Sequence, residues 1–172
     1  MPAGATYEPI TTTTLSSSAS FVEFTSVSQN YTDLIVVGQY SFVSNGVRYA
    51  SLRVGNGSVD TGTNYSDTYL DTYYGTPGSG RNTNVAQALF SYSDSDGLTT
   101  SQSQVAVAHF MNYSNTTTYK TIINRNMSAA DMVSAYVNLW RSTSAINTIR
   151  IIAGFADFAS GSTFTIYGIK AA

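Results

Sequence analysis

Cysteine is absent from the 172-residue sequence, so disulfide bonds, thiolate metal sites and a cysteine nucleophile are all excluded. Charged residues make up 10% of the chain, against about 25% in an ordinary soluble domain, and the net charge is −2. The sequence has no basic stripe for phosphate groups and no apolar run of about 18 residues that could span a membrane. It therefore predicts neither a nucleic-acid partner nor a membrane partner, and a surface built from hydroxyl and amide groups.

Short segments rich in Val, Ile, Tyr, Phe and Thr recur from Phe21 onward, separated by clusters of Gly, Asn, Asp and Ser. This pattern predicts strands. We expect them over residues 21–27, 33–42, 47–54, 68–74, 84–92, 103–113, 119–125, 133–141, 147–154 and 162–169. A helix could form over 127–137, but the following VNLWR favours a strand. Strands at this spacing predict an all-β fold, a jelly-roll-like antiparallel β-sandwich.

Three local patterns give more specific expectations. The turn sequence VSNG predicts that segments 33–42 and 47–54 pair as an antiparallel hairpin. The glycine-rich segment GTPGSGRNT, residues 75–83, predicts a mobile loop. In the last segment, alternation places Phe164 and Ile166 inward, and we expect this strand to pair between earlier strands of the chain.

The first twenty residues are rich in Ser and Thr and contain Pro2 and Pro9, so they predict an extended N-terminal arm. Residues 21–172 then form a single β-sandwich domain. The leading PAGATYEPITTTT lacks the basic and apolar regions of a secretory signal, which predicts synthesis and folding in a cytosol.

Candidate catalytic and metal-binding groups are few. Asp67 and Asp71 could form a glycosidase pair, but turn or strand-edge aspartates explain them as well. His109 is the single imidazole, and its alternating strand favours a hydrogen-bonded histidine in the core or an interface. SDSDG, residues 93–97, is similar to the opening of a calcium loop but lacks the expected Glu. We therefore predict no catalytic residue, no metal site, no cofactor and no enzyme activity.

Tyrosine is abundant, with 13 copies, several of them in TNYSDTYLDTYYG at residues 63–75. Tyrosine combined with Asn, Asp and Ser offers flat apolar faces beside hydrogen-bonding groups, which suits sugars or a protein partner. The candidate platform for a glycan or partner consists of Tyr65, Tyr69, Tyr73, Tyr74 and Arg81. The alternative is that these tyrosines fill the rim of the sandwich.

Several stretches, taken together, carry a resemblance over nearly the whole chain. They are YEPI, YTDLIVV, SLRVGNGSVDTGTNYSDTYL, MNYSNTTTYKTIINR, LWRSTSAINTIRI and FASGSTFTIYGIKAA. The chain resembles a family of small virion structural proteins of tailed bacteriophages, common among cyanophages, whose relatives also occur as modules of tail-fibre-like proteins. The family's turn commonly reads NGDTGxNY, whereas Ser58 and Val59 lengthen it here. The resemblance implies a β-sandwich on the outside of a virion and no established reaction.

The resulting hypothesis is a non-enzymatic capsid decoration or cement protein, made in the host cytoplasm and located on the virion exterior. It would form a homotrimer and clamp the major capsid protein. Tyr7, Pro9, Ile10 and Leu15 would anchor the arm on the capsid or a neighbouring subunit. The alternative is a tail-fibre or receptor-binding module that binds host surface polysaccharide.

Overall fold

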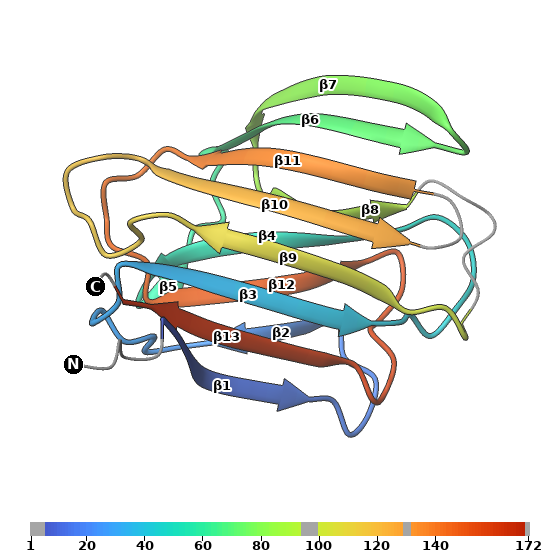
Figure 1. Cartoon of the computed structure of the whole chain (residues 1–172), viewed down its shortest axis with the longest axis horizontal. Helices are drawn as coiled ribbons and strands as arrows, with labels where there is room; N and C mark the ends of the chain where they lie inside the picture. The colour runs from blue at the N-terminus through green and yellow to red at the C-terminus, as the bar shows by residue number, and fades with distance from the viewer. Residues whose placement is uncertain (1–5, 94–99, 129–131, 171–172) are drawn as a thin grey trace.

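The computed structural model describes residues 6–93, 100–128 and 132–170, and all regular structure within these ranges is β-strand. Two antiparallel sheets pack together, which confirms the predicted all-β sandwich (Figure 1). In chain order the strands are β1 (Tyr7–Thr14), β2 (Phe21–Phe24), β3 (Asp33–Tyr40), β4 (Arg48–Asn56), β5 (Ser58–Val59), β6 (Tyr65–Tyr73), β7 (Thr76–Val85), β8 (Ala88–Ser93), β9 (Gln104–Phe110), β10 (Lys120–Ser128), β11 (Met132–Trp140), β12 (Thr148–Gly154) and β13 (Thr163–Ile169).

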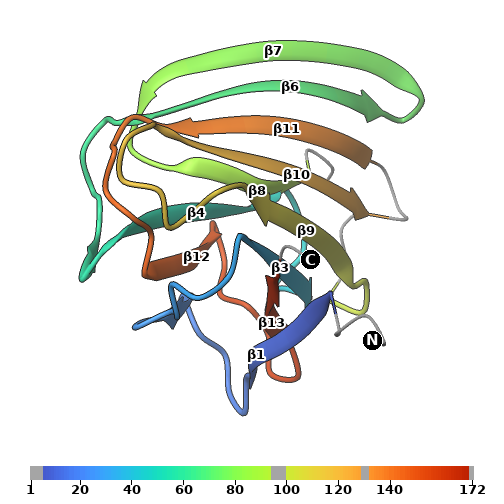
Figure 2. The same cartoon turned by 60° about the vertical axis from the view of Figure 1, so that its left-hand side comes forward.

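The larger sheet has eight strands in the order β1-β13-β3-β9-β10-β11-β6-β7, so β1 and β7 are its edges (Figure 1). The smaller sheet has five, in the order β2-β12-β4-β5, with β8 on the other side of β4. The hairpin of β6 and β7 projects past β8 and β4 at one end of the sandwich (Figure 2). This overhang positions the candidate site described below.

Strand β13 shows how alternation builds the core. Phe164 and Ile166 are fully buried, whereas Thr163, Thr165 and Tyr167 are partly exposed. The strand pairs with β1 on one side and β3 on the other. Both the inward pair and the internal position were predicted from the sequence.

An aromatic cluster occupies the centre of the core between the two sheets. The Tyr40 ring stacks on Phe164 with centroids 5.4 Å apart, and Phe158 lies 5.0 Å from Phe164. Phe42 and Phe90 also contact Tyr40. Burying each such side chain stabilises the fold by about 1.5–3 kcal/mol.

Asparagine side chains connect the larger sheet to β8, whose partner among the described strands is β4. Asn124 Nδ2 donates to the carbonyl oxygens of Leu89 and Phe90, each at 2.9 Å. Asn138 Oδ1 accepts from the Leu89 amide at 3.2 Å, and Asn138 Nδ2 donates to Asn124 Oδ1 at 2.5 Å. The free edge of β8 is thus satisfied by side chains from the facing sheet, as buried backbone groups require.

The predicted hairpin between segments 33–42 and 47–54 is wrong. β3 pairs with β13 and β9 in the larger sheet, whereas β4 pairs with β12, β8 and β5 in the smaller one. The connection therefore crosses between sheets. Arg48 holds this crossing by donating to the Ser44 carbonyl at 3.2 Å and to the Ser44 hydroxyl at 2.8 Å.

Two further segments, residues 75–83 and residues 58–59, contain strands where a loop or a turn was expected. Residues 75–83, expected to be a mobile loop, lie mostly in strand β7, which pairs with β6 along its full length. Ser58 and Val59 form β5 and fold back on β4. Gly57, with φ of +80°, makes the tight turn between them, a conformation that favours glycine.

The expected N-terminal arm is largely part of the sandwich, because β1 is the edge strand beside β13. Pro9 lacks an N–H donor, and an edge strand tolerates this because one side of the strand needs no partner. Ile10 and Leu15 pack against the chain's own core, so they do not serve as free anchors for another protein. Tyr7 remains exposed, and Lys170 binds Glu8 across the pair of strands at 2.8 Å.

Candidate functional site

A cleft lies between the β6–β7 hairpin and β8, at the edge of the smaller sheet. It consists of two hollows, with volumes of about 580 Å³ and 400 Å³, that share Asn82, Leu89 and Tyr92 in their walls. The remaining lining residues of the first hollow are Tyr49, Arg53, Asp67, Val85, Ala86, Gln87 and Phe155, and those of the second are Tyr69, Asp71, Tyr73, Met132 and Tyr136. We call the two hollows together the cleft.

Strand alternation places the cleft residues of β6. Asp67, Tyr69, Asp71 and Tyr73 are spaced two apart, so they share the face of the hairpin that looks toward β8. Their partners on β7 include glycines: Gly80 lies opposite Tyr69, and Gly78 opposite Asp71.

A Cβ atom at either glycine would overlap the side chain opposite, the Tyr69 hydroxyl or the Asp71 carboxylate. The glycines that suggested a loop therefore make room for two cleft side chains to lean across β7. This use of glycine for close approach needs no positive φ.

Asp67 is the most buried acidic group of the cleft. Asn82 Nδ2 donates to its Oδ1 at 3.0 Å, and the described residues give Oδ2 no hydrogen-bond partner. Burial raises the pKa of the Asp67 carboxyl, and the bond from Asn82 offsets part of that effect. The cleft thus presents one carboxylate oxygen next to an amide, in surroundings where a hydrogen bond is stronger than in water.

Asp67 and Asp71, considered as a glycosidase pair, lie four residues apart on β6. Four residues of extended chain separate their Cα atoms by roughly 13 Å. Retaining and inverting glycosidases hold their two carboxyl groups about 5–5.5 Å or 6.5–9.5 Å apart. Either separation would require the two side chains to lean toward each other, whereas Asp71 leans across β7 toward Gly78.

Two exposed aromatic residues have unusual backbone conformations. Phe155 has φ of +67° and is 74% exposed, and its ring meets Tyr49 edge-on at 5.1 Å at the mouth of the cleft. Tyr74 has φ of +45° and is 63% exposed, and its ring lies 4.8 Å from Tyr73 at the turn between β6 and β7. At Tyr74 this conformation belongs to the two-residue hairpin turn that it forms with Gly75, whose φ is also positive. At Phe155, a bulky residue in this region costs on the order of 1–3 kcal/mol, and such strain is concentrated at functional sites.

The structure separates the residues expected to form one platform. Tyr69 and Tyr73 line the cleft, and Tyr74 follows them at the turn. Tyr65 is fully buried, and its hydroxyl bonds to Val54 and Asp60, so its ring is not available to a ligand. Arg81 lies opposite Thr68 on the other face of the hairpin, because it is one residue out of phase with Asn82.

Sequence reasoning missed half of the cleft. Tyr49, Tyr92, Tyr136 and Phe155 come from β4, β8, β11 and the loop after β12, which only the tertiary fold brings together. Asn82 was assigned to a loop. The alternation of β6 was the single local signal.

His109 lies outside the cleft, on the face of the larger sheet turned away from the smaller sheet. Its Nε2 is 2.9 Å from Asp33 Oδ2, and the other oxygen of Asp33 accepts a bond from the Asn112 amide at 2.7 Å. The hydrogen bonding expected for this histidine is confirmed. The pair ties the end of β9 to the start of β3.

The described ranges offer neither a metal centre nor a membrane-spanning helix. Residues 6–93, 100–128 and 132–170 contain no cluster of three or more His, Cys, Asp or Glu side chains suited to a metal ion. No helix in those ranges has the length and apolar character needed to cross a membrane. Asp94 and Asp96, from the calcium-like SDSDG segment, lie outside the described residues.

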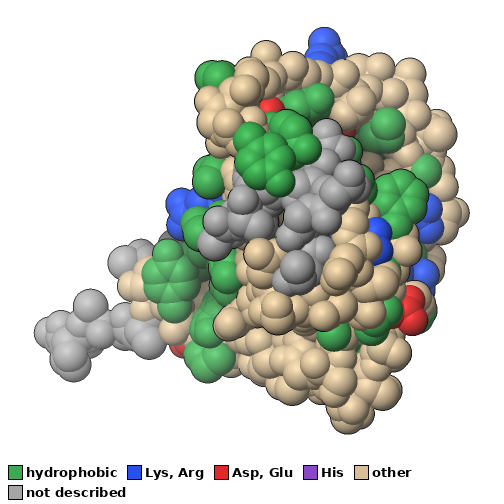
Figure 3. All heavy atoms as spheres, turned by 90° about the vertical axis from the view of Figure 1, so that its right-hand side faces the viewer, with side chains coloured by type: hydrophobic (Ala, Val, Ile, Leu, Met, Phe, Trp, Pro, Cys, Tyr) green, Lys and Arg blue, Asp and Glu red, His purple; other side chains and the backbone are tan. Residues whose placement is uncertain are grey.

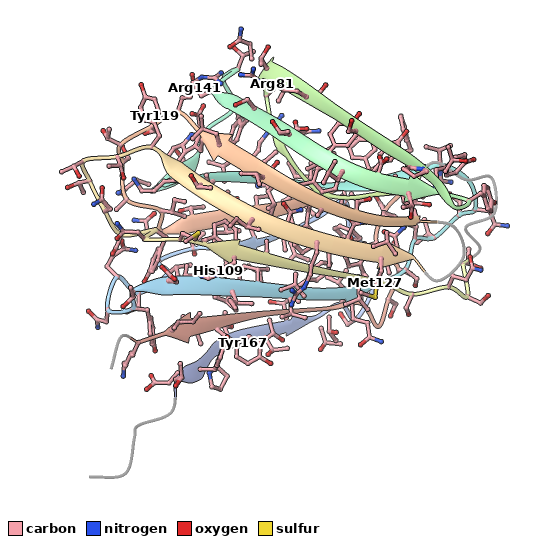
Figure 4. All side chains as sticks on the ribbon, turned by 45° about the horizontal axis from the view of Figure 1, so that its top comes forward. Arg81, His109, Tyr119, Met127, Arg141 and Tyr167 are labelled. Atoms are coloured by element: carbon pink, nitrogen blue, oxygen red, sulfur yellow. The ribbon has the colours of Figure 1, made fainter. Side chains whose placement is uncertain are left out.

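The face of the larger sheet that bears His109, Met127 and Tyr167 is the second notable surface, and we call it the outer face (Figure 4). Its register brings together Met127 with Val133, and Ile123 with Val137, across β10 and β11. Leu70 on β6 is 68% exposed and Val133 is 58% exposed. Strand neighbours thus form a connected apolar area rather than scattered single residues.

Charge is sparse on the surface as a whole. The side view in Figure 3 shows a surface formed mainly by uncharged polar side chains and backbone, with a few basic and acidic groups.

No model of a known protein family matches the chain, and no curated protein is significantly similar to it. The cleft and the outer face are the two surfaces of the molecule that bear on its function.

Proposed function

We propose that this chain is a non-enzymatic structural protein of the exterior of a tailed-bacteriophage particle, a capsid decoration protein that acts as a homotrimer on the major capsid protein. The resemblance seen in the sequence supplies the virion context. The observation that carries the proposal is the connected apolar area of the outer face, which offers a surface for a subunit contact.

Size supports this use of the outer face. The whole outer face has eight strands, each about seven residues long in their paired parts, and spans roughly 38 Å by 23 Å, or about 900 Å². Its apolar part lies on four neighbouring strands and covers about half of that area. A standard stable interface buries about 800 Å² on each partner. Soluble monomers rarely expose connected apolar areas of more than a few hundred Å², and larger ones mark contacts with other molecules.

The occupant of the outer face is a second copy of this chain. Four neighbouring strands contribute aliphatic side chains to its apolar part, and Arg125 is the charged residue at the centre of that part. A cyclic trimer joins two different patches of each subunit, so Arg125 does not have to meet its own copy. Low charge on the remaining surface lets many such subunits crowd on a shell without strong repulsion.

Oligomeric state in solution tests the subunit contact. Light scattering and native mass spectrometry of the purified protein should give a trimer. The double substitution Val133→Glu and Val137→Glu should give a folded monomer, because both side chains are exposed and their loss leaves the core intact. Thr25→Glu, an exposed position in the loop after β2, is the matched control and should remain trimeric. A wild-type monomer at high protein concentration would exclude this contact.

Location on the particle tests the virion role separately. Labelled antibody against this chain should decorate the whole capsid in electron cryomicroscopy, and protein quantification should give hundreds of copies per particle. Labelling confined to the tail, or a handful of copies, would contradict a decoration protein.

A second candidate function is attachment of the particle to a host surface polysaccharide, and the cleft is the observation that favours it. Tyrosine rings and hydrogen-bonding groups line one elongated depression there. Because the cleft and the outer face lie on opposite sides of the β6–β7 hairpin, a subunit contact would leave the cleft accessible. The two functions can therefore be tested independently.

A further inference from the structure

We propose that the cleft is a binding site for an uncharged segment of polysaccharide, held by Asp67 and Asn82 and flanked by the exposed ring of Phe155. The assignment of a ligand class deepens the second candidate function and rests on it for its biological role. The binding site itself is a property of the folded chain.

Shape indicates a chain-like ligand. Pockets of about 300–1,000 Å³ accept small organic ligands, and here two hollows of about 580 Å³ and 400 Å³ adjoin through Asn82, Leu89 and Tyr92. The cleft follows β6 from Asp67 to Tyr73, a distance of roughly 20 Å for six residues of strand. A run of linked sugar rings fills such a depression better than one compact molecule does.

The polar anchor matches the hydroxyl groups of a sugar. Asp67 accepts from Asn82 through Oδ1 and keeps Oδ2 for a donor, while the Asn82 side chain is fixed by that bond. Each sugar hydroxyl can donate to a carboxylate oxygen, and such charge-assisted bonds are about twice as strong as neutral ones. The buried position of Asp67 excludes competing water and strengthens the bond further.

Charge decides which saccharides fit. Among the described residues, the carboxylates of Asp67 and Asp71 line the cleft, and Arg53 is the basic residue in its wall. Arg53 Nε already donates to the Ala86 carbonyl at 3.1 Å. A sulfated or uronic-acid sugar would place a negative charge near both carboxylates, which disfavours binding. The cleft therefore selects neutral sugars.

The aromatic residues at the two ends provide stacking surfaces. Phe155 at one end and Tyr74 at the other present exposed rings, and Tyr73 lies half-buried beside Tyr74. Phe155 combines an exposed ring with a costly positive φ, so its position calls for an external contact. Flat apolar faces of sugar rings are suitable partners for such side chains.

A glycan array and calorimetric titration test the proposal. The array should carry neutral probes, namely dextran, mannan and galactan fragments, beside the anionic probes heparin and polygalacturonate. We expect saturable binding of at least one neutral probe and none of the anionic probes. Phe155→Ser and Asp67→Asn should each weaken the binding constant by about tenfold or more, equal to about 1.4 kcal/mol. Asp33→Asn, on the outer face, is the matched carboxylate control and should not change it.

Each result has a definite meaning. Phe155 is exposed, so Phe155→Ser should fold like the wild type and remains informative if another variant does not. Failure of every neutral probe at millimolar concentration, preference for the anionic probes, or binding that neither cleft variant changes would overturn the site. Binding to neutral probes without binding to host cells would refute the attachment function alone. Host-cell binding that survives both cleft substitutions would keep that function and remove the cleft from it.

Discussion

Replacing Asn138 by leucine should test whether side-chain amides hold β8 onto the larger sheet. Leucine is close in size, so the change removes the amide without leaving a large void. Asn124 Oδ1 loses its donor at 2.5 Å, and the Leu89 amide loses its acceptor at 3.2 Å. An orphaned buried polar group costs about 1–3 kcal/mol. Because the Leu89 amide is only partly buried, we expect a total loss of about 2–3 kcal/mol in the free energy of unfolding.

Urea unfolding followed by the fluorescence of Trp140, the single tryptophan, gives the measurement. The midpoint should fall while the slope with denaturant stays constant, which shows a change in stability rather than in the denatured state. Asn30→Leu, at an exposed position, is the matched control and should change stability by less than about 0.5 kcal/mol. The double variant Asn124→Leu/Asn138→Leu should lose less than the sum of the single changes, because neither amide is then orphaned by the other. An Asn138→Leu protein as stable as the wild type would refute this account of the sheet contact.

Three further perturbations follow from the core and the cleft. Phe164→Ala should cost about 3–5 kcal/mol in urea unfolding, because the ring is fully buried against Tyr40 and Phe158; a loss below about 1 kcal/mol would contradict a central β13. Burial raises the pKa of the Asp67 carboxyl above its value in the unfolded chain. The contribution of this group to the free energy of unfolding is therefore fully present below the unfolded pKa of about 4, and it is lost as the pH rises through the folded pKa. Asp67→Asn should therefore match the wild type at about pH 3 and exceed it at about pH 7 in thermal melts, and an unchanged difference across that range would show that burial does not perturb the group. Tyr65→Phe should lower the unfolding free energy by about 1–3 kcal/mol, since the Val54 amide loses its acceptor at 3.0 Å; a neutral change would show that water replaces the hydroxyl.

Strand existence was readable from the sequence because it depends on local alternation. In β13, the inward positions of Phe164 and Ile166 follow directly from a period of two. Pairing is different, since it depends on which segments share a sheet. VSNG has the composition of a hairpin turn, yet the chain crosses there from one sheet to the other, and Arg48 rather than strand pairing satisfies the turn. Turn composition alone could not distinguish these outcomes.

Strand β7 and the N-terminal segment were missed as strands for a related reason. Both are edge strands rich in small or hydroxyl residues, with most side chains exposed, so no apolar alternation marks them. Their partners β13 and β6 supply the apolar side chains and define the register. Edge strands of this kind can be predicted from a sequence only when the partner strand is already known.

Only part of the candidate site could be predicted from the sequence, for the same physical reason. Tyr69 and Tyr73 are two positions of one alternating strand, so their shared face could be read from the sequence. Arg81 and Asn82 are adjacent in β7, and only the pairing register decides that Asn82 faces the cleft while Arg81 faces away. Tyr65 belongs to the same face as Tyr69 but lies under the body of the sandwich, where its hydroxyl bonds to the Val54 backbone. Position along β6, rather than residue type, separates core from cleft.

The β6–β7 hairpin joins the two proposed functions in one element. One of its faces carries Leu70 into the apolar area of the outer face, and the other carries Asp67 and Tyr69 into the cleft. The two faces stay separate because residues of β6 alternate between them, and Gly78 and Gly80 give Asp71 and Tyr69 room on the cleft side. Gly80→Ala should consequently disturb Tyr69 and saccharide binding while leaving the oligomeric state unchanged. If Gly80→Ala removed both saccharide binding and the oligomer, the hairpin would move as a unit and the two surfaces would not be independent.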